Sequence, residues 1–336
     1  YYDWNSDRVP IYIDPMMQLS PYIMTRRSDA TNTAKVEIRC DAIEQFITDQ
    51  REKGEVFTYN DVVVASLVRL YSKRWQLNRF VVGRKIYDRY KMTVAFVIKK
   101  GLRDNSAETT VKVDFDGSED IYEVRNKINA VVEENLVNSD VNVMDLVVAK
   151  LMRLPSWLLI FFVGLIKFSD RIGLFPKVFM DASPFHTSCF ITFLKSIKSD
   201  YVYHHIYDFG TTGLFFAMGR DKFVPSVNPD KSVTAEKTIT MGVTMDERFA
   251  DGLYLANSVR LWTSLLQRPE QLLEKGDKMF TKEIVLQRRA EQIKIRKMQL
   301  RELRVNIKKN TKALKEQRKR DAKKAREERK NITRIF

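Results

Sequence analysis

The sequence contains little cysteine, little histidine and no long apolar run. Among 336 residues only Cys40 and Cys189 are cysteines, so a disulfide framework is excluded. No Cys-x-x-Cys pair or Cys/His cluster predicts zinc, and we therefore expect no metal. The longest apolar run, 157–166, is shorter than the roughly 20 residues that span a bilayer, and no signal peptide is recognisable. We expect a cytoplasmic protein, with membrane association left open.

The formal net charge of +15 is concentrated at one end of the chain. Residues 281–336 hold 21 of the 58 Lys and Arg but only 7 of the 43 Asp and Glu, which leaves about +1 for residues 1–280. Over the whole chain, 44% of the residues are hydrophobic and 11% are aromatic, which are values typical of a protein with a folded core. Basicity is thus a property of the tail.

The hydrophobic pattern of the body predicts alternating strands and helices. Thr58 is a plausible N-cap of a buried helix over 58–75. A later helix, with Leu255, Val259, Trp262 and Leu266 on one face, is closed by Pro269. The remaining expected elements are strands at 92–98, 109–115, 189–197, 213–219 and 237–244 and a helix at 120–134. We therefore expect an α/β domain over 1–272, followed by a basic helical tail over 273–336.

Residues 141–176 are a hydrophobic helical insertion within this pattern. Apolar residues crowd together with few charges, and Pro155 and Pro176 bracket a helix that reaches at least Phe168. One interpretation is a core or interface helix. The other is a hydrophobic flap over an acyl-chain pocket, or a surface that faces a membrane.

Five apolar residues of the tail recur at intervals of seven within a strongly charged segment. These residues are Leu286, Ile293, Leu300, Ile307 and Leu314. The second apolar position that a coiled coil requires is mostly Arg, Lys or Ala, so we expect a basic helix that needs a partner. Three roles stay open for 281–336: a charged helix that stabilises oligomers, binding of an anionic partner such as nucleic acid or a lipid surface, and specific base readout. The last is disfavoured because 310–330 contains no aromatic residue.

The segment 244–252, Thr-Met-Asp-Glu-Arg-Phe-Ala-Asp-Gly, resembles a known motif. It is similar to the closing His-x-x-x-Asp-Gly motif of the chloramphenicol acetyltransferase-like superfamily, which includes the catalytic cores of 2-oxoacid dehydrogenase acyltransferases (dihydrolipoamide acyltransferase-like proteins). Glu247 stands in the place of the family's histidine, as in a subgroup in which Asp-Glu-Arg replaces Asp-His-Arg. Further matches over about 8–270 are Met-Thr-Arg-Arg at 24–27, Leu-Asn-Arg-Phe at 77–80, Gly-Leu at 101–102 and the strand around Thr192.

The resemblance implies a two-layer α/β sandwich with a mixed sheet and an active site between subunits of a homotrimer. It implies CoA or acyl-CoA as a substrate, a small-molecule acyl acceptor, Glu247 as base, and Thr192 as hydrogen-bond donor to the oxyanion. In this scheme Asp251 is held by Arg26, or by Arg27 as second choice, and Arg248 and Gly252 support the turn. His204 and His205 are candidates to line the channel, and a dyad of His205 with Asp208 would require a turn.

The replacement of histidine by glutamate separates two hypotheses. A carboxylate near pKa 4.3 lies roughly 4 units below a thiol near 8.5, so it is a poorly matched base unless burial between subunits reduces the difference. The first hypothesis is an acyltransferase that moves an acyl group from CoA or a related thioester through an oxyanion intermediate. The second is a catalytically inactive trimeric scaffold or binding module whose basic tail contacts an anionic partner. We expect no lipoyl domain, because 1–57 contains no Asp-Lys-Ala turn.

Overall fold

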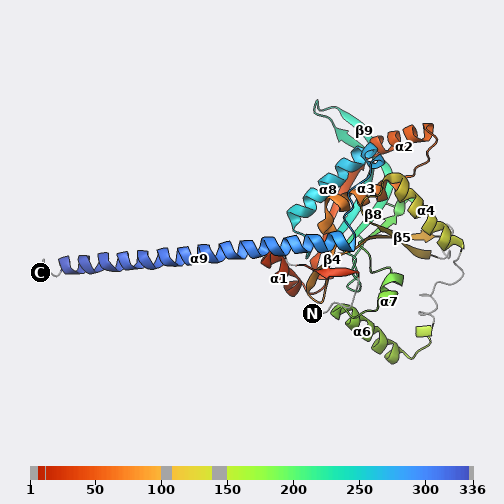
Figure 1. Ribbon diagram of the computed structural model, residues 1–336. Coiled ribbons are helices and arrows are strands. Elements are labelled where there is room, and N and C mark those ends of the chain that lie inside the picture. Colours follow the sequence, from red (N-terminus) through yellow and green to blue (C-terminus); the bar gives the residue numbers. More distant parts are fainter. Residues whose placement is uncertain (1–6, 12, 100–107, 138–149, 333–336) are drawn as a thin grey trace. The chain divides into compact units, whose positions relative to one another are not determined.

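The computed structural model describes residues 7–11, 13–99, 108–137 and 150–332 (Figure 1). The chain divides into two compact units, Tyr1–Leu286 and Gln287–Phe336. The first unit extends beyond the expected boundary at 272. The amides of Met279 and Phe280 donate to the carbonyl oxygen of Asp116, and the Phe280 side chain is buried. This stretch therefore packs with the body.

A six-stranded mixed sheet forms the centre of the first unit. Its strand order is β2-β9-β8-β7-β5-β6, and only the β5–β7 and β7–β8 pairs are parallel. The strands are β2 (Thr31–Arg39), β5 (Met92–Lys99), β6 (Glu108–Phe115), β7 (Cys189–Phe193), β8 (Leu214–Val227) and β9 (Val233–Asp246). A small antiparallel sheet, in the order β1-β4-β3, contains β1 (Arg8–Pro10), β3 (Arg79–Val82) and β4 (Lys85–Arg89).

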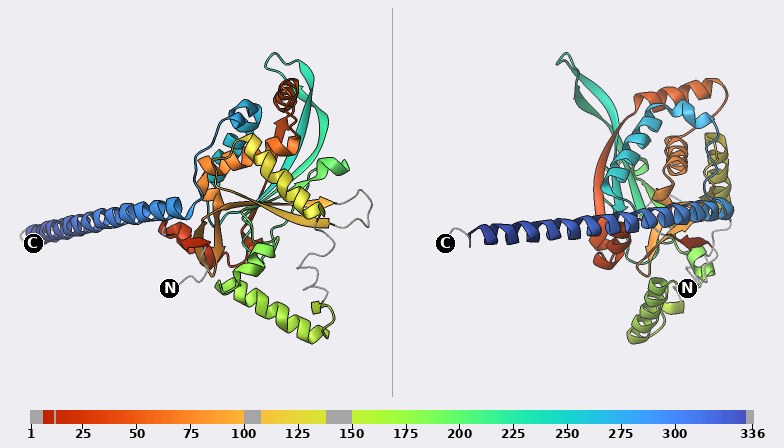
Figure 2. Two further views of the ribbon diagram at one scale, coloured as in Figure 1. Left: turned by 45° about the vertical axis from the view of Figure 1, so that its right-hand side comes forward. Right: turned by 60° about the vertical axis from the view of Figure 1, so that its left-hand side comes forward.

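Four helices share one hydrophobic core with the large sheet (Figure 2). They are α2 (Asp41–Glu52), α3 (Tyr59–Lys73), α4 (Ile121–Val137) and α8 (Gly252–Gln267). Thr58 caps α3, as the sequence predicted, and the structure shows that the cap is a reciprocal capping box with Asp61. Trp262 of α8 is fully buried, lies 5.1 Å from Phe216 between ring centroids and donates to Ser66 Oγ over 2.8 Å. The α/β sandwich with a mixed sheet is confirmed.

The strands differ from the sequence prediction at their ends. β7 stops at Phe193, where its ladder to β8 ends, and Leu194–Ile197 forms the 3₁₀ turn η3 instead of continuing the strand. β8 and β9 are longer than expected, because beyond an irregularity between Met218 and Asp221 they pair with each other as a two-stranded ribbon. The other 3₁₀ turns are η1 (Ser28–Ala30), η2 (Trp75–Asn78) and η4 (Pro269–Leu273).

Three further helices of the first unit are α1 (Pro15–Ile23), α6 (Ser156–Ile172) and α7 (Lys177–Ala182). The sequence allowed α6 to be a core or interface helix. In this chain only its Asp170 is buried, so α6 is not a core helix, and a role at an interface stays a prediction. The first part of the expected insertion, 141–149, lies outside the described residues, as does Gly101-Leu102. Within the part of the chain that the structure describes, no helix has the length and apolarity that a membrane span requires.

The second unit belongs to α9 (Lys282–Ile332), the long basic helix that the tail sequence predicted. Leu300, Ile307 and Leu314, three of the residues that recur every seven positions, are exposed. The helix thus presents an apolar stripe among many cations, and the expected need for a partner stays a prediction.

Candidate functional site

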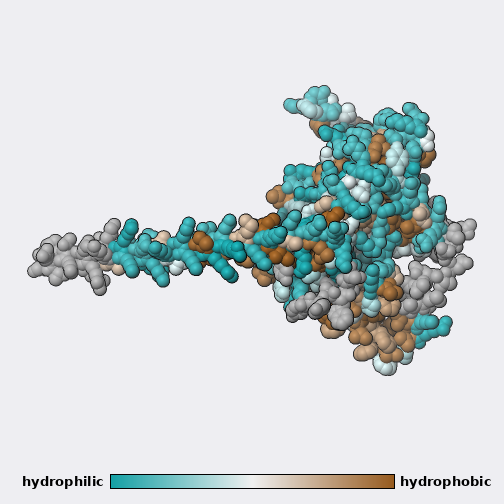
Figure 3. Space-filling view, viewed as in Figure 1, coloured by the Kyte–Doolittle hydropathy of each residue, from teal (hydrophilic) through white to brown (hydrophobic). Residues whose placement is uncertain are grey.

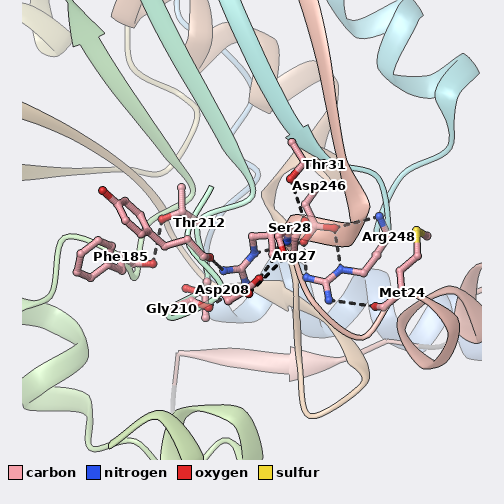
Figure 4. A network of polar contacts seen from close by, with 12 residues as sticks. Met24, Arg27, Ser28, Thr31, Phe185, Asp208, Gly210, Thr212, Asp246 and Arg248 are labelled. Atoms are coloured by element: carbon pink, nitrogen blue, oxygen red, sulfur yellow. Dashed lines mark hydrogen bonds and ion pairs between the residues drawn. The ribbon is translucent and has the colours of Figure 1, made fainter. Parts of the chain in front are cut away.

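The turn between β9 and α8 is built around a buried carboxylate, Asp246. Its Oδ1 accepts from Arg248 Nε over 2.8 Å, and its Oδ2 accepts from Arg248 Nη2 over 2.7 Å and from Arg27 Nε over 3.4 Å (Figure 4). The Arg248 amide also donates to Oδ1, over 3.1 Å. All three side chains are at most 5% exposed. Burial lowers the pKa of Arg27, and the Asp246 carboxylate opposes that effect.

Asp246 supplies one negative charge for two buried arginines, and backbone carbonyl oxygens of a neighbouring loop accept the remaining hydrogen bonds of Arg27. Arg27 donates from Nη1 to the Tyr207 carbonyl over 2.6 Å and from Nη2 to the Gly210 carbonyl over 2.8 Å. Buried cations that lack an equal number of anions need such acceptors. Asp246 and its two arginines therefore lock the end of β9 onto residues that are distant in the sequence.

This arrangement corrects the expected pairing of Asp251 with Arg26. Both side chains are exposed, and the Asp251 carboxylate caps α8 by accepting from the Tyr254 amide over 2.7 Å. The arginine that turns inward is Arg27, and its partner is Asp246. The glycine at Gly252 is not required for the turn either, because a Cβ there would meet nothing within 4 Å and its φ is not positive.

Glu247 stands exposed between two buried neighbours, Asp246 and Arg248. Its amide donates to the Ala30 carbonyl over 3.0 Å, which fixes the backbone that carries the carboxylate. At the position where a base is expected, the backbone of Glu247 is thus held in place while its carboxylate is exposed to solvent. Within one chain, the Glu247 carboxylate is not buried as it would need to be to become a stronger base.

Thr192 and Glu247 do not meet within one chain. Thr192 on β7 pairs with Ala217 on β8, which pairs with Gly242 on β9. Gly242 is therefore level with Thr192 two strands away, which is about 10 Å across the sheet. Glu247 follows Gly242 by five residues, which adds about 17 Å along the strand direction. The Thr192 side chain is partly exposed. A reaction that uses both residues requires a second copy of the chain.

His204 and His205 form a stack rather than a dyad with Asp208. The His204 ring lies on Phe215, with centroids 3.9 Å apart and an interplanar angle of 3°, and its Nδ1 contacts the His205 carbonyl oxygen over 2.8 Å. Burial lowers the pKa of His204. Asp208 accepts from the Ser28 amide over 3.0 Å and from its hydroxyl over 3.3 Å. The roles of the two histidines as lining residues stay a prediction.

The third histidine, His186, occupies a buried polar relay that the sequence did not indicate. Its Nε2 lies 3.0 Å from Asp170 Oδ1 and its Nδ1 lies 2.9 Å from Ser183 Oγ. Burial lowers the pKa of His186, against the effect of Asp170. Because an ionised carboxylate can only accept, Nε2 is the donor in the contact with Asp170. Burial would raise the pKa of Asp170, but hydrogen bonds from His186 and Gly210 lower it overall.

The relay resembles a hydrolytic triad in composition only. Ser183 is 2% exposed, and its Oγ also accepts from the Phe185 amide over 3.3 Å. Asp170 Oδ2 accepts from the Gly210 amide over 2.9 Å, and the Gly210 carbonyl accepts from Arg27. The relay therefore ties α6 to the support of Glu247 and is structural.

A small cationic pocket lies beside the relay. It is lined by Asp7, Arg8, Arg89, Lys91, Thr93, Lys112, Met180, Asp181, His186 and Thr211. Burial lowers the pKa of Arg89 to about 9 and that of Lys112 to about 8. Backbone carbonyls already accept from both: those of residues 187 and 211 from Arg89, and those of residues 180, 181 and 183 from Lys112. Among the described residues, no group of three or more His, Cys, Asp or Glu side chains is arranged to hold a metal.

Comparison with known proteins gives structural similarity alone. No family model matches the sequence, and no curated protein matches it. A probable dihydrolipoamide acetyltransferase from Listeria monocytogenes is 12% identical over 79% of this chain and 95% of its own, with a TM-score of 0.49. A dihydrolipoamide acetyltransferase from Azotobacter vinelandii is 13% identical over 78% and 94%, with a TM-score of 0.48. A chloramphenicol acetyltransferase is 9% identical over 77% and 100%, with a TM-score of 0.45. These values assign the chain to no family.

Proposed function

We propose that this protein is an acyltransferase that moves an acyl group from CoA or a related thioester to a small acceptor. The observation that carries the proposal is the position of Glu247. Its carboxylate is exposed, whereas the adjacent residues Asp246 and Arg248 are buried and hydrogen-bonded to each other. A fixed carboxylate of this kind can accept or orient a proton at a defined position. The resemblance of the segment 244–252 to an acyltransferase motif supports the choice of reaction.

The proposed site lies between two copies of the chain, in a homotrimer. The strand register supports this, because it separates Thr192 from Glu247 by about 17 Å along the sheet within one copy. In the proposed cyclic assembly the β9–α8 turn of one copy would lie beside β7 of the next. Enclosure between copies would also exclude water and make the Glu247 carboxylate a stronger base.

In the proposed reaction the acceptor attacks the thioester carbonyl and forms a tetrahedral intermediate. The Thr192 hydroxyl donates a hydrogen bond to the oxyanion. Glu247 accepts the proton that the acceptor loses and returns it to the departing CoA thiolate when the carbon–sulfur bond breaks. Asp246, Arg27 and Arg248 hold Glu247 in place and take no part in the proton transfer.

The test is release of free CoA from acyl-CoA by the full chain, followed with a thiol-reactive dye. We expect Glu247→Gln and Thr192→Val each to reduce kcat/KM by about 100-fold or more. Glu52→Gln and Thr33→Val, which change an exposed helix residue and an exposed strand residue, serve as matched controls and should leave the rate unchanged. Turnover that survives both site substitutions would remove these residues from the mechanism.

The second candidate is a catalytically inactive trimeric scaffold whose basic tail contacts an anionic partner. It is favoured by the absence of an imidazole at position 247 and by the exposed cations of α9. Absence of turnover on any acyl-CoA, together with binding of an anionic polymer that weakens steeply with salt, would favour it. Salt-insensitive binding would contradict the electrostatic part of this hypothesis.

A further inference from the structure

We propose that α6 and the start of α7 form a docking face for the surface of an anionic lipid bilayer. The docking face comprises Trp157, Ile160, Phe161, Leu165, Phe168 and Val178, which are all exposed. Trp157 and Ile160 retain 71% and 72% of their accessible surface, and Val178 retains 77%. Figure 3 shows hydrophobic side chains gathered over this part of the first unit. Apolar side chains this exposed and this closely grouped mark an interaction site.

The polar contacts of α6 hold it on the body by one side. Asp170, the only buried residue of the helix, bonds His186 and the Gly210 amide. Just beyond the helix end, the Gly173 carbonyl accepts from Arg8 over 3.4 Å. Since the polar anchor faces inward, the aromatic and aliphatic side chains of the docking face are directed to solvent.

The charges around the docking face select an anionic surface. Lys150, Arg153, Lys167, Arg171 and Lys177 are all exposed. Asp170 is the sole acidic residue of α6, and it is buried, whereas α7 has one exposed acid, Asp181. Exposed cations before and at the end of an apolar helix that has a tryptophan near one end are typical of a helix that lies in the headgroup region, with its cations on the lipid phosphates. At 17 residues α6 is too short to span a bilayer, so it would lie along the surface.

The same charges argue against a second copy as the occupant. Two docking faces related by a two-fold axis would bring five cations of each copy together, and the one exposed acid of α7, Asp181, does not balance them. A bilayer that contains anionic lipid satisfies both the apolar and the cationic residues.

The experiment is flotation of the full chain with vesicles of phosphatidylcholine alone or of phosphatidylcholine and phosphatidylglycerol in equal parts. The basic tail can also bind anionic lipid, and the chain has four tryptophans, so the readout is the difference in tryptophan emission between the wild type and Trp157→Phe, which isolates the docking face. We expect a blue shift with anionic vesicles that Trp157→Phe abolishes. Ile160→Asp with Phe161→Asp should weaken partitioning by about tenfold or more, because charge on the apolar face opposes insertion. Phe223→Asp, at an equally exposed apolar position on the β8–β9 ribbon, should not weaken it.

Two outcomes would overturn the proposal. Equal flotation of the wild type and the double-Asp variant, without a Trp157 shift, would leave the tail as the only contact with lipid. Failure to bind vesicles, combined with dissociation of an oligomer when Phe161 is changed to Asp, would assign the face to contacts between copies. All substituted side chains are exposed, so circular dichroism should show native folding of each variant.

Discussion

Replacement of Asp246 by asparagine tests the support of Glu247. The amide keeps one acceptor oxygen but presents an NH₂ group in place of Oδ2, which accepts from Arg27 Nε and Arg248 Nη2. Two hydrogen bonds to charged donors are lost, at about 1.5–3 kcal/mol each, and two guanidinium groups stay buried without an anion. We expect the free energy of unfolding to fall by about 3–5 kcal/mol, a large share of the 5–15 kcal/mol typical of a domain.

The assay is urea unfolding of the full chain followed by far-UV circular dichroism. An unchanged denaturant slope would show that the variant still unfolds as a cooperative unit. The matched control is Asp208→Asn, which alters an exposed carboxylate that accepts from the amide and hydroxyl of Ser28 and should cost less than about 1 kcal/mol. A loss below about 1 kcal/mol for Asp246→Asn would refute the view that this carboxylate anchors the turn.

Three further substitutions probe separate parts of the structure. Asp251→Ala removes the cap on the Tyr254 amide and should lower the free energy of unfolding by about 1 kcal/mol; no loss would contradict the capping role. Gly210→Ala places a Cβ 2.2 Å from the Phe185 carbonyl oxygen at a φ of +92°, and we expect a loss of about 2 kcal/mol or more by the same urea assay. Burial lowers the pKa of Lys112 to about 8 from 10.5, so between these values the unfolded chain binds more protons and the free energy of unfolding rises with pH. Lys112→Met should make that rise smaller than in the wild type when unfolding is compared at the two ends of the window, with the part due to Arg89, whose pKa burial lowers to about 9, remaining; an unchanged slope would contradict it.

Much of the fold follows from local patterns in the sequence. The capping residue Thr58 and the apolar spacing of 58–75 predict α3, and the alternation of Val111, Val113 and Phe115 predicts β6. The β8–β9 ribbon was missed because residues 220–227 follow a polar run, 220–222, with the exposed apolar residues Phe223 and Val227 and with Pro225, so the pairing leaves no regular alternation. The exposure of α6 was also not deducible, since a uniformly apolar helix has the same pattern whether it is buried or not.

The candidate site shows the limit of motif reasoning more clearly. The motif predicts that Asp251 is the aspartate that binds a buried arginine. In the structure Asp246 points inward instead, and this depends on the register of β2 and β9, which pairs Asp246 with Thr31. The partners of His186 lie on α6 and on the turn after α7, and no local signal connects them. Only the tertiary fold brings these residues together.

Complementation between two inactive variants tests the central claim, a site shared by two copies, most directly. Chains with Glu247→Gln and chains with Thr192→Val, each inactive alone, are co-expressed in equal amounts and assayed for release of CoA. In a cyclic assembly each site takes Glu247 from one copy and Thr192 from the next, so about a quarter of the wild-type activity should return. Mixed assemblies that form but recover no activity would contradict a site built from these two residues across the interface.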